Sequence, residues 1–293
     1  MKLFNRPAAI IVIAGALVLL VLSLSGISDK EAVDVAKRFY QKTGVRVTAE
    51  PRVDSHWLVE LMTGEKEVVV GEREKRFSLL TLSTKTKEVA SFTLLQWKKS
   101  EAEKQIKLEL SESEAKETII GLASRIGLPR DFELDTIKLD KKDGLWGGIW
   151  KRKYHGYPFE KDLISIGIRE GDGEFFSYWK SSSGRSCPTD VVVTREQALE
   201  IARNKVYSLL ADERAHLQDY VVSSPELKIV QPNAVFGRFS PYHRANSRLA
   251  WAVMYTVNNN KQDLTIGNAN FKEWFVIKID ASTGMVIGGS SAR

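Results

Sequence analysis

The side chains that most often bind metals or transfer protons are scattered along this chain. Its four histidines fall on different predicted elements, and no H-x-x-x-H or H-E-x-x-H spacing joins two of them. Such spacings place two imidazoles on one helix face, where they can share a metal ion. The chain also lacks a G-x-S-x-G nucleophile motif, a G-x-x-x-x-G-K phosphate loop and a paired-glycine dinucleotide motif. We therefore expect no catalytic residue, no metal site and no cofactor. The histidines are His56, His155, His216 and His243.

The carboxylates nearest the recurring motifs have a structural explanation. Glu31 and Glu114 each stand three residues after a serine, and Gln197 stands three residues after a threonine. A side chain at this position closes a helix cap, and glutamine cannot act as an acid or a base. The stretch Gly171-Asp172-Gly173 looks like part of a calcium loop but lacks the oxygen ligands that should follow, so it predicts a hairpin turn.

Cys187 is the only cysteine, which excludes an internal disulfide framework and a cysteine-based metal site. Two interpretations of it stay open: a tolerated small residue, or a nucleophilic thiol that would need a nearby base. Its surroundings, residues 181–190, are rich in serine and interrupted by Gly184 and Pro188, which predicts a linker.

A group of aromatic and cationic residues forms the strongest candidate for a binding site. It lies in the first of two long predicted loops, Gln231 to Arg248 and Asn258 to Phe271. Such side chains are enriched where proteins bind one another. The alternative is a loop that folds back on its own sheet. The residues are Phe236, Arg238, Phe239, Tyr242, His243 and Arg244.

Three similar phrases predict the helices that position these loops. They begin at Ser28, Ser111 and Thr194, each 83 residues after the one before, and each continues with Glu or Gln and then Ala. This pattern is a capping box, and its equal spacing indicates a repeated unit. An apolar stripe follows at helical spacing in all three.

Short apolar runs after each helix predict strands, so each unit is α+β: one helix packed on a three- to four-stranded antiparallel sheet. In the stretch from Trp274 to Ile287, alternation puts Ile277 on one face and Lys278 and Asp280 on the other, which indicates a sheet with one buried face. Asp280 to Gly284 then predicts a tight turn. The other predicted strands are Arg46 to Ala49, His56 to Met62, Phe77 to Leu82, Val89 to Leu94, Glu133 to Leu139, Gly148 to Tyr154, Leu163 to Ile168, Phe175 to Trp179, Leu227 to Val230 and Leu249 to Val257.

The N-terminus predicts export. Lys2 and Arg6 precede an uninterrupted run of apolar or small residues at 8–24, and acids follow it. This order places everything from Ser28 onward outside the cytoplasm. The run suits either a single-pass membrane anchor, which we favour, or a cleaved signal peptide that leaves the protein secreted.

The charge pattern does not predict nucleic-acid binding. The formal net charge is +6, and acids and cations are interspersed, for example from Glu65 to Arg76. A nucleic-acid-binding protein usually gathers its cations on one face. Binding of wall polymer or another anionic surface stays open as an alternative function.

The residues described above also carry a family resemblance. The sequences T-R-E-Q-A-L-E-I-A-R at 194–203 and W-F-V-I-K-I-D-A-S-T-G-M-V-I at 274–287 resemble the PepSY domain of peptidase propeptides. The segments 150–152, 156–159 and 162–166 resemble the related YcdB/YcdC repeat of exported bacterial proteins. The first unit has Lys87 where the family's turn has glycine.

The resemblance implies an organisation and a function. Together with the apolar run and the 83-residue spacing, it predicts an anchor or signal at residues 1–27 and three tandem PepSY-like units: 28–110, the YcdB/YcdC-like 111–190, and the PepSY unit 191–293. It further implies a non-enzymatic extracytoplasmic protein that restrains or assists an envelope hydrolase, either a peptidase or a cell-wall lytic enzyme. Similar repeats occur in membrane-anchored spore germination proteins that work with a cortex-lytic enzyme.

Overall fold

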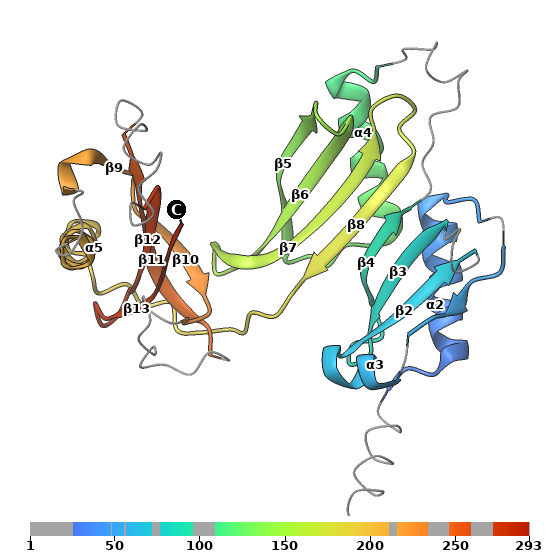
Figure 1. Ribbon diagram of the computed structural model, residues 1–293, viewed down its shortest axis with the longest axis horizontal. Coiled ribbons are helices and arrows are strands. Elements are labelled where there is room, and N and C mark those ends of the chain that lie inside the picture. Colours follow the sequence, from blue (N-terminus) through green and yellow to red (C-terminus); the bar gives the residue numbers. More distant parts are fainter. Residues whose placement is uncertain are drawn as a thin grey trace, which may run out of the picture. The chain divides into compact units, whose positions relative to one another are not determined.

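The structure is a computed structural model that describes residues 26–47, 49–55, 57–71, 77–95, 109–210, 216–233, 246–258 and 272–292 (Figure 1). The chain divides into two compact units, which are treated separately below. The N-terminal unit comprises the described parts of Met1–Arg130, Leu134–Trp150 and Ile164–Ser181. The C-terminal unit comprises those of Asp131–Glu133, Lys151–Leu163 and Ser182–Arg293.

The described elements form a mixed α+β fold, as predicted. The division into three tandem units stays a prediction. The helices are α2 (Asp29–Thr43), α3 (Trp57–Thr63), α4 (Glu112–Ile126), α5 (Arg195–Leu210) and the short 3₁₀ helix η1 (Leu217–Asp219). The strands are β1 (Arg52–Val53), β2 (Glu65–Val70), β3 (Ser78–Ser83), β4 (Val89–Leu94), β5 (Phe132–Asp140), β6 (Leu145–Tyr154), β7 (Tyr157–Arg169), β8 (Phe175–Ser181), β9 (Tyr220–Val222), β10 (Glu226–Val230), β11 (Arg248–Val257), β12 (Trp274–Asp280) and β13 (Val286–Ala292).

The three predicted helix starts are confirmed. The Ser28 hydroxyl accepts a hydrogen bond from the backbone N–H of Glu31 at 3.2 Å. Ser111 and Glu114 form a complete capping box, in which each side chain bonds the other residue's backbone N–H. Thr194 and Gln197 do the same, at 3.2 and 2.8 Å. These bonds satisfy backbone donors that a helix N-terminus otherwise leaves unpaired.

In the N-terminal unit, strands pair in the order β1-β2-β3-β4-β8, and β8 pairs with β7. Helix α2 packs on this sheet through Phe39, whose ring centroid lies 5.8 Å from that of Phe92 and 5.5 Å from that of Tyr178. Phe92 on β4 also stacks on Phe175 of β8 at 5.1 Å. The aromatic cluster therefore joins strands that the sequence separates by about 80 residues.

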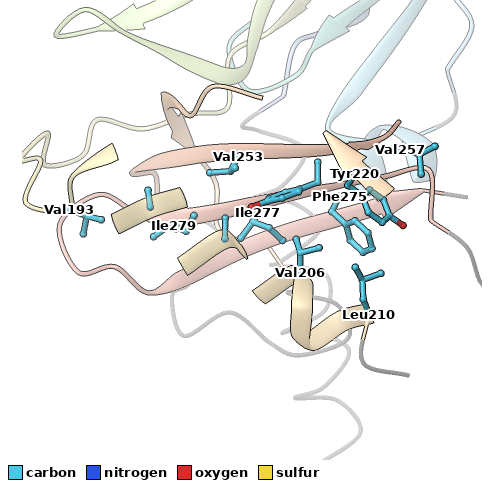
Figure 2. Close-up of a cluster of buried hydrophobic side chains, with 12 residues drawn as sticks. Val193, Val206, Leu210, Tyr220, Val253, Val257, Phe275, Ile277 and Ile279 are labelled. Atoms are coloured by element: carbon cyan, nitrogen blue, oxygen red, sulfur yellow. The ribbon is translucent and has the colours of Figure 1, made fainter. Parts of the chain in front are cut away.

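In the C-terminal unit, the order is β10-β11-β12-β13, with β9 also paired to β11 and the start of β7 paired to β10. One sheet face is covered by α5 (Figure 2). Val206 and Leu210 of α5 lie against Phe275 and Ile277 of β12, and all four are buried. The apolar alternation predicted for β12 thus builds this core.

Two strand predictions for the first unit are wrong, and one strand was not predicted. The residues predicted as a strand from His56 to Met62 contain α3. The predicted strand from Arg46 to Ala49 does not occur among the described residues, and pairing begins at β1. The mixed-charge segment that begins at Glu65 contains β2. A short apolar run fits a helix or a strand equally well, so the sequence alone does not distinguish the two. In the structure, Glu60 of α3 accepts a hydrogen bond from the Ser55 hydroxyl at 2.6 Å.

The turns after β3, β7 and β12 share one backbone geometry. In each, the residue that ends the strand donates its backbone N–H to the carbonyl of the fifth residue after it, at 2.9 Å. Its own carbonyl accepts the N–H of the fourth residue after it, at 2.8 to 3.0 Å. The residue after the strand end also donates its N–H to a carbonyl within one residue of the start of another strand, at 2.8 or 2.9 Å. The strand ends are Ser83, Arg169 and Asp280, and the neighbouring carbonyls belong to Gly64, Gly144 and Leu249.

The fifth residue of each turn has a positive φ: 58° at Lys87, 69° at Gly173 and 73° at Gly284. Glycine enters this region without a Cβ clash, whereas lysine does so at a cost. The hairpin turns predicted at Gly173 and Gly284 are confirmed. Lys87 makes the same turn as its two glycine counterparts.

Candidate binding site of the C-terminal unit

The predicted partner-binding residues Phe236, Arg238, Phe239, Tyr242, His243 and Arg244 lie outside the described residues. The residues on either side of this loop are described. Before it, the Asn233 backbone N–H donates to the Ile287 carbonyl at 3.2 Å, and its side-chain amide donates to the Gly289 carbonyl at 3.0 Å. After it, the buried Ser247 hydroxyl accepts from the Arg185 N–H at 2.7 Å.

Residues 182–190, which we call the strap, are irregular as the linker prediction expected, but they are held by specific contacts. The Asp162 carboxylate accepts the N–H groups of Ser183 and Gly184 at 3.0 to 3.1 Å. Arg152 Nη1 donates to the Gly184 carbonyl at 2.9 Å. The Gln231 amide donates to Ser183 at 3.2 Å. The strap therefore fixes residues on both sides of the loop.

At position 184, only glycine fits without displacing neighbouring side chains. A Cβ there would lie 2.4 Å from Phe159 Cδ1 and 2.8 Å from Asp162 Oδ2. The Arg152 guanidinium carbon stands 4.7 Å from the centre of the same Phe159 ring, a cation–π distance. Arg152, Phe159 and Asp162 thus surround the backbone at Gly184, and we call these three side chains the clamp.

The clamp places a guanidinium between two carboxylates. Arg152 Nε donates to Asp131 at 2.7 Å and Nη1 donates to Asp162 at 3.0 Å. Burial would lower the pKa of Arg152, but the hydrogen bonds to the two acids outweigh it and raise the pKa. The buried Asp162 is therefore paired with a permanent positive charge.

A second ion pair lies on the β12 face opposite α5, where a solvent-facing surface was predicted. Asp280 is 1% exposed, and its carboxylate accepts from Arg248 Nε at 2.7 Å. It also accepts the N–H groups of Ser282 and Thr283 at 3.0 and 2.9 Å. Burial would raise the pKa of Asp280, but these bonds, led by that from Arg248, lower it below its ordinary value.

A third pair crosses this face. Lys278 Nζ lies 2.6 Å from a Glu160 carboxylate oxygen, and the lysine side chain is 7% exposed. Strands β10 and β11 separate the two residues in the sheet order. On β11, the residues in register with Lys278 and Asp280 are Ala252 and Ala250. Because alanines are small, they leave room for the lysine to extend across the sheet. The prediction of one buried face is therefore wrong.

The remaining candidate residues that the structure describes are a cysteine and two histidines. Burial raises the pKa of the Cys187 thiol, with Arg248 acting in the opposite direction, so the thiol is protonated at neutral pH. His155 stands in the β6–β7 turn, and the His216 N–H caps η1 through Asp219 at 2.9 Å. The other two histidines lie outside the described residues, and the described part of the chain contains no cluster of three metal-ligating side chains.

The paired charges were missed at the sequence level, although a signal for some of them exists. Arg152 and Asp162 stand in the first and the last of the three segments that resemble the YcdB/YcdC repeat, and the β6–β7 hairpin brings these two segments side by side. Lys278 and Asp280 alternate with apolar residues and therefore resembled a solvated face. Nothing in the local sequence predicts their partners, which lie on other strands.

Comparison with known proteins gives a fold and no family. No family model matches the chain, and no curated protein matches it. Its fold is similar to that of the Bacillus megaterium YpeB C-terminal domain. That solved structure has a TM-score of 0.50 and 11% sequence identity, with coverage of 92% of this chain and 99% of its own. At this identity the likeness concerns the fold alone. Among the described residues, no helix is long and apolar enough to cross a membrane, and residues 8–24 lie outside them.

Proposed function

We propose that the chain is a membrane-anchored, extracytoplasmic array of three PepSY-like units, which binds an envelope hydrolase and restrains or assists it. The supporting observation is that a chain with PepSY-like sequence motifs also has a fold similar to that of the YpeB C-terminal domain over 92% of its length. The turn geometry shared by β3, β7 and β12 supports the three-unit organisation, because the same hydrogen bonds recur once per proposed unit.

The proposed contact surface is the loop between Asn233 and Ser247 together with a sheet edge. On β9, Val221 is 56% and Val222 is 43% exposed. The Asp219 carbonyl accepts the N–H of Asn258, just after β11, and the Ser223 N–H donates to Met254 of β11. Backbone groups of an edge strand point alternately toward and away from the paired strand, so those of Val222 point away from β11. A partner segment in extended form could pair there, with side chains of the loop as anchors.

Direct binding of wall polymer is a less favoured function. The cations of the candidate site, Arg152, Arg248 and Lys278, each lie in an ion pair with an acid of the same unit. They therefore add little attraction for a polyanion. Polyanion binding would weaken steeply with added salt, whereas strand pairing would not.

The test is co-purification of the full-length chain from its native envelope after mild crosslinking, followed by peptidase and peptidoglycan-hydrolase assays of the recovered proteins. The proposal predicts that a hydrolase is recovered and that Val222→Pro, which removes one backbone donor, reduces its recovery. The double variant Phe239→Ala and Tyr242→Ala tests the loop in the same way. Tyr207→Ala, on the exposed face of α5, is the control. Absence of any hydrolase would contradict the proposal.

A further inference from the structure

Helix α3 presents two apolar side chains to solvent on one face. Met62 is 85% exposed and Leu58, four residues earlier, is 46% exposed. Residues four apart on a helix are neighbours, so the two form one patch. Met62 is also the most exposed large apolar side chain of the described residues. Single exposed apolar residues are common, so the meaning of this patch depends on where it lies.

The patch is fixed beside the first turn of α2. Lys66 on β2 has a side chain only 6% exposed, and its Nζ lies 2.6 Å from Asp29 Oδ1 and 3.3 Å from Glu60 Oε2. Asp29 is the first residue of α2, and Glu60 lies at the middle of α3. The nearly buried ammonium is paired with both acids and so links α3 to the start of α2. Figure 1 shows α3 and the start of α2 at the same end of the N-terminal unit.

In the sequence, the apolar run directly precedes this end of the unit. Leu24, its last residue, precedes Asp29 by five positions. Five residues span at most about 17 Å when fully extended. If the run spans a membrane, as the proposed function holds, the start of α2 lies close to the bilayer surface, and so does the α3 patch.

We infer that the α3 face formed by Leu58 and Met62 lies in the interfacial layer of the lipid bilayer, next to the anchor. This inference rests on the anchoring part of the proposed function. Apolar side chains on a short interfacial helix insert at the boundary between headgroups and acyl chains. The acid of α3 and the acids in the first turn of α2 form ion pairs: Asp29 and Glu60 with Lys66, and Glu31 with Lys87 at 3.1 Å. The contact is therefore mainly apolar, and we expect added salt to leave it intact.

The experiment uses the full-length chain with Cys187→Ser, reconstituted in vesicles of phosphatidylethanolamine and phosphatidylglycerol. Met62→Cys carries an environment-sensitive fluorophore, and Ile120→Cys, at 43% exposure on α4 of the same unit, is the matched control. We expect a blue shift at Met62 and quenching by lipids with a nitroxide at a shallow acyl position. We expect neither effect at Ile120. Leu58→Cys should behave as Met62→Cys does.

A label at Leu20→Cys, inside the apolar run, separates the two ideas that could fail. Quenching at Leu20 without quenching at Met62 would overturn the α3 contact and leave the anchor in place. Absence of quenching at Leu20 would overturn both. A blue shift at Met62 that depends on protein concentration and not on lipid would assign the patch to a second copy of the chain and overturn the lipid contact.

Discussion

At Gly184 the backbone passes between Phe159 and Asp162 with no space for a side chain. Gly184→Ala must therefore displace the strap or the ring, and we expect it to lower the free energy of unfolding by about 2 to 3 kcal/mol. Chemical denaturation measures this change. The matched control is Gly121→Ala on α4, where an added Cβ meets nothing within 4 Å. That substitution should stabilise the helix by up to about 1 kcal/mol. Equal effects at the two sites would contradict the clamp.

Asp280 makes stability depend on pH in a defined direction. Its folded-state pKa lies below the ordinary value of 3.8, because hydrogen bonds led by that from Arg248 outweigh the effect of burial. The stabilisation is therefore complete above about pH 3.8 and is lost as the pH falls through the lowered pKa. Asp280→Asn should cost about 1.5 to 3 kcal/mol at neutral pH and flatten the acid limb of the unfolding curve.

Urea titrations at a series of pH values below 5 measure this prediction. Asp190→Asn, which removes one exposed charge from the strap, is the control for the loss of a negative charge. An unchanged acid limb in Asp280→Asn would show that the carboxylate does not contribute this stability.

Lys87 occupies a backbone conformation that its glycine counterparts adopt without strain. Lys87→Gly should relieve about 1 kcal/mol of strain. It also loses an exposed ion pair with Glu31, which is worth less than about 1 kcal/mol. We expect a net gain of about 0.5 kcal/mol from these two effects, and Glu31→Gln measures the ion-pair part separately. A net loss larger than that of Glu31→Gln would contradict the comparison of the three turns.

At the scale of elements, the strap is held by side chains of β6 and β7. Asp162→Asn removes the carboxylate that accepts two strap N–H groups. We expect faster hydrogen exchange at Ser183 and Gly184, measured by mass spectrometry or NMR. Glu133→Gln removes an acid that pairs with Lys153 at 2.5 Å and leaves the strap contacts in place, so it serves as the control. Equal exchange in the two variants would show that Asp162 does not hold the strap.

Local signals predicted some elements and could not predict others. The caps at Ser111 and Thr194 follow from residues three positions apart, so the sequence is sufficient to place them. Helix α3 was predicted as a strand because seven residues are too few to distinguish the periodicity of a helix from that of a strand. The burial of Lys278 depends on Glu160, a residue 118 positions away, which no local pattern includes. The proposed loop site remains a prediction from composition.

At the scale of the whole molecule, we propose that an N-terminal anchor is joined to units that bind a hydrolase outside the cytoplasm. The fold likeness supports the type of unit, and the recurring turns support their number. The anchor would keep the binding surface near the membrane. It would also restrict the partner to hydrolases of the envelope.

Proximity labelling in the native envelope tests the central claim most directly. A biotin-ligating enzyme fused after Arg293 would label neighbouring proteins, with the same enzyme on an unrelated anchored protein as the control. The account predicts that a peptidase or a cell-wall lytic enzyme is enriched over this control and that the enrichment falls when Phe239 and Tyr242 become alanine. Labelling that shows no such hydrolase, or that is confined to cytoplasmic proteins, would contradict it.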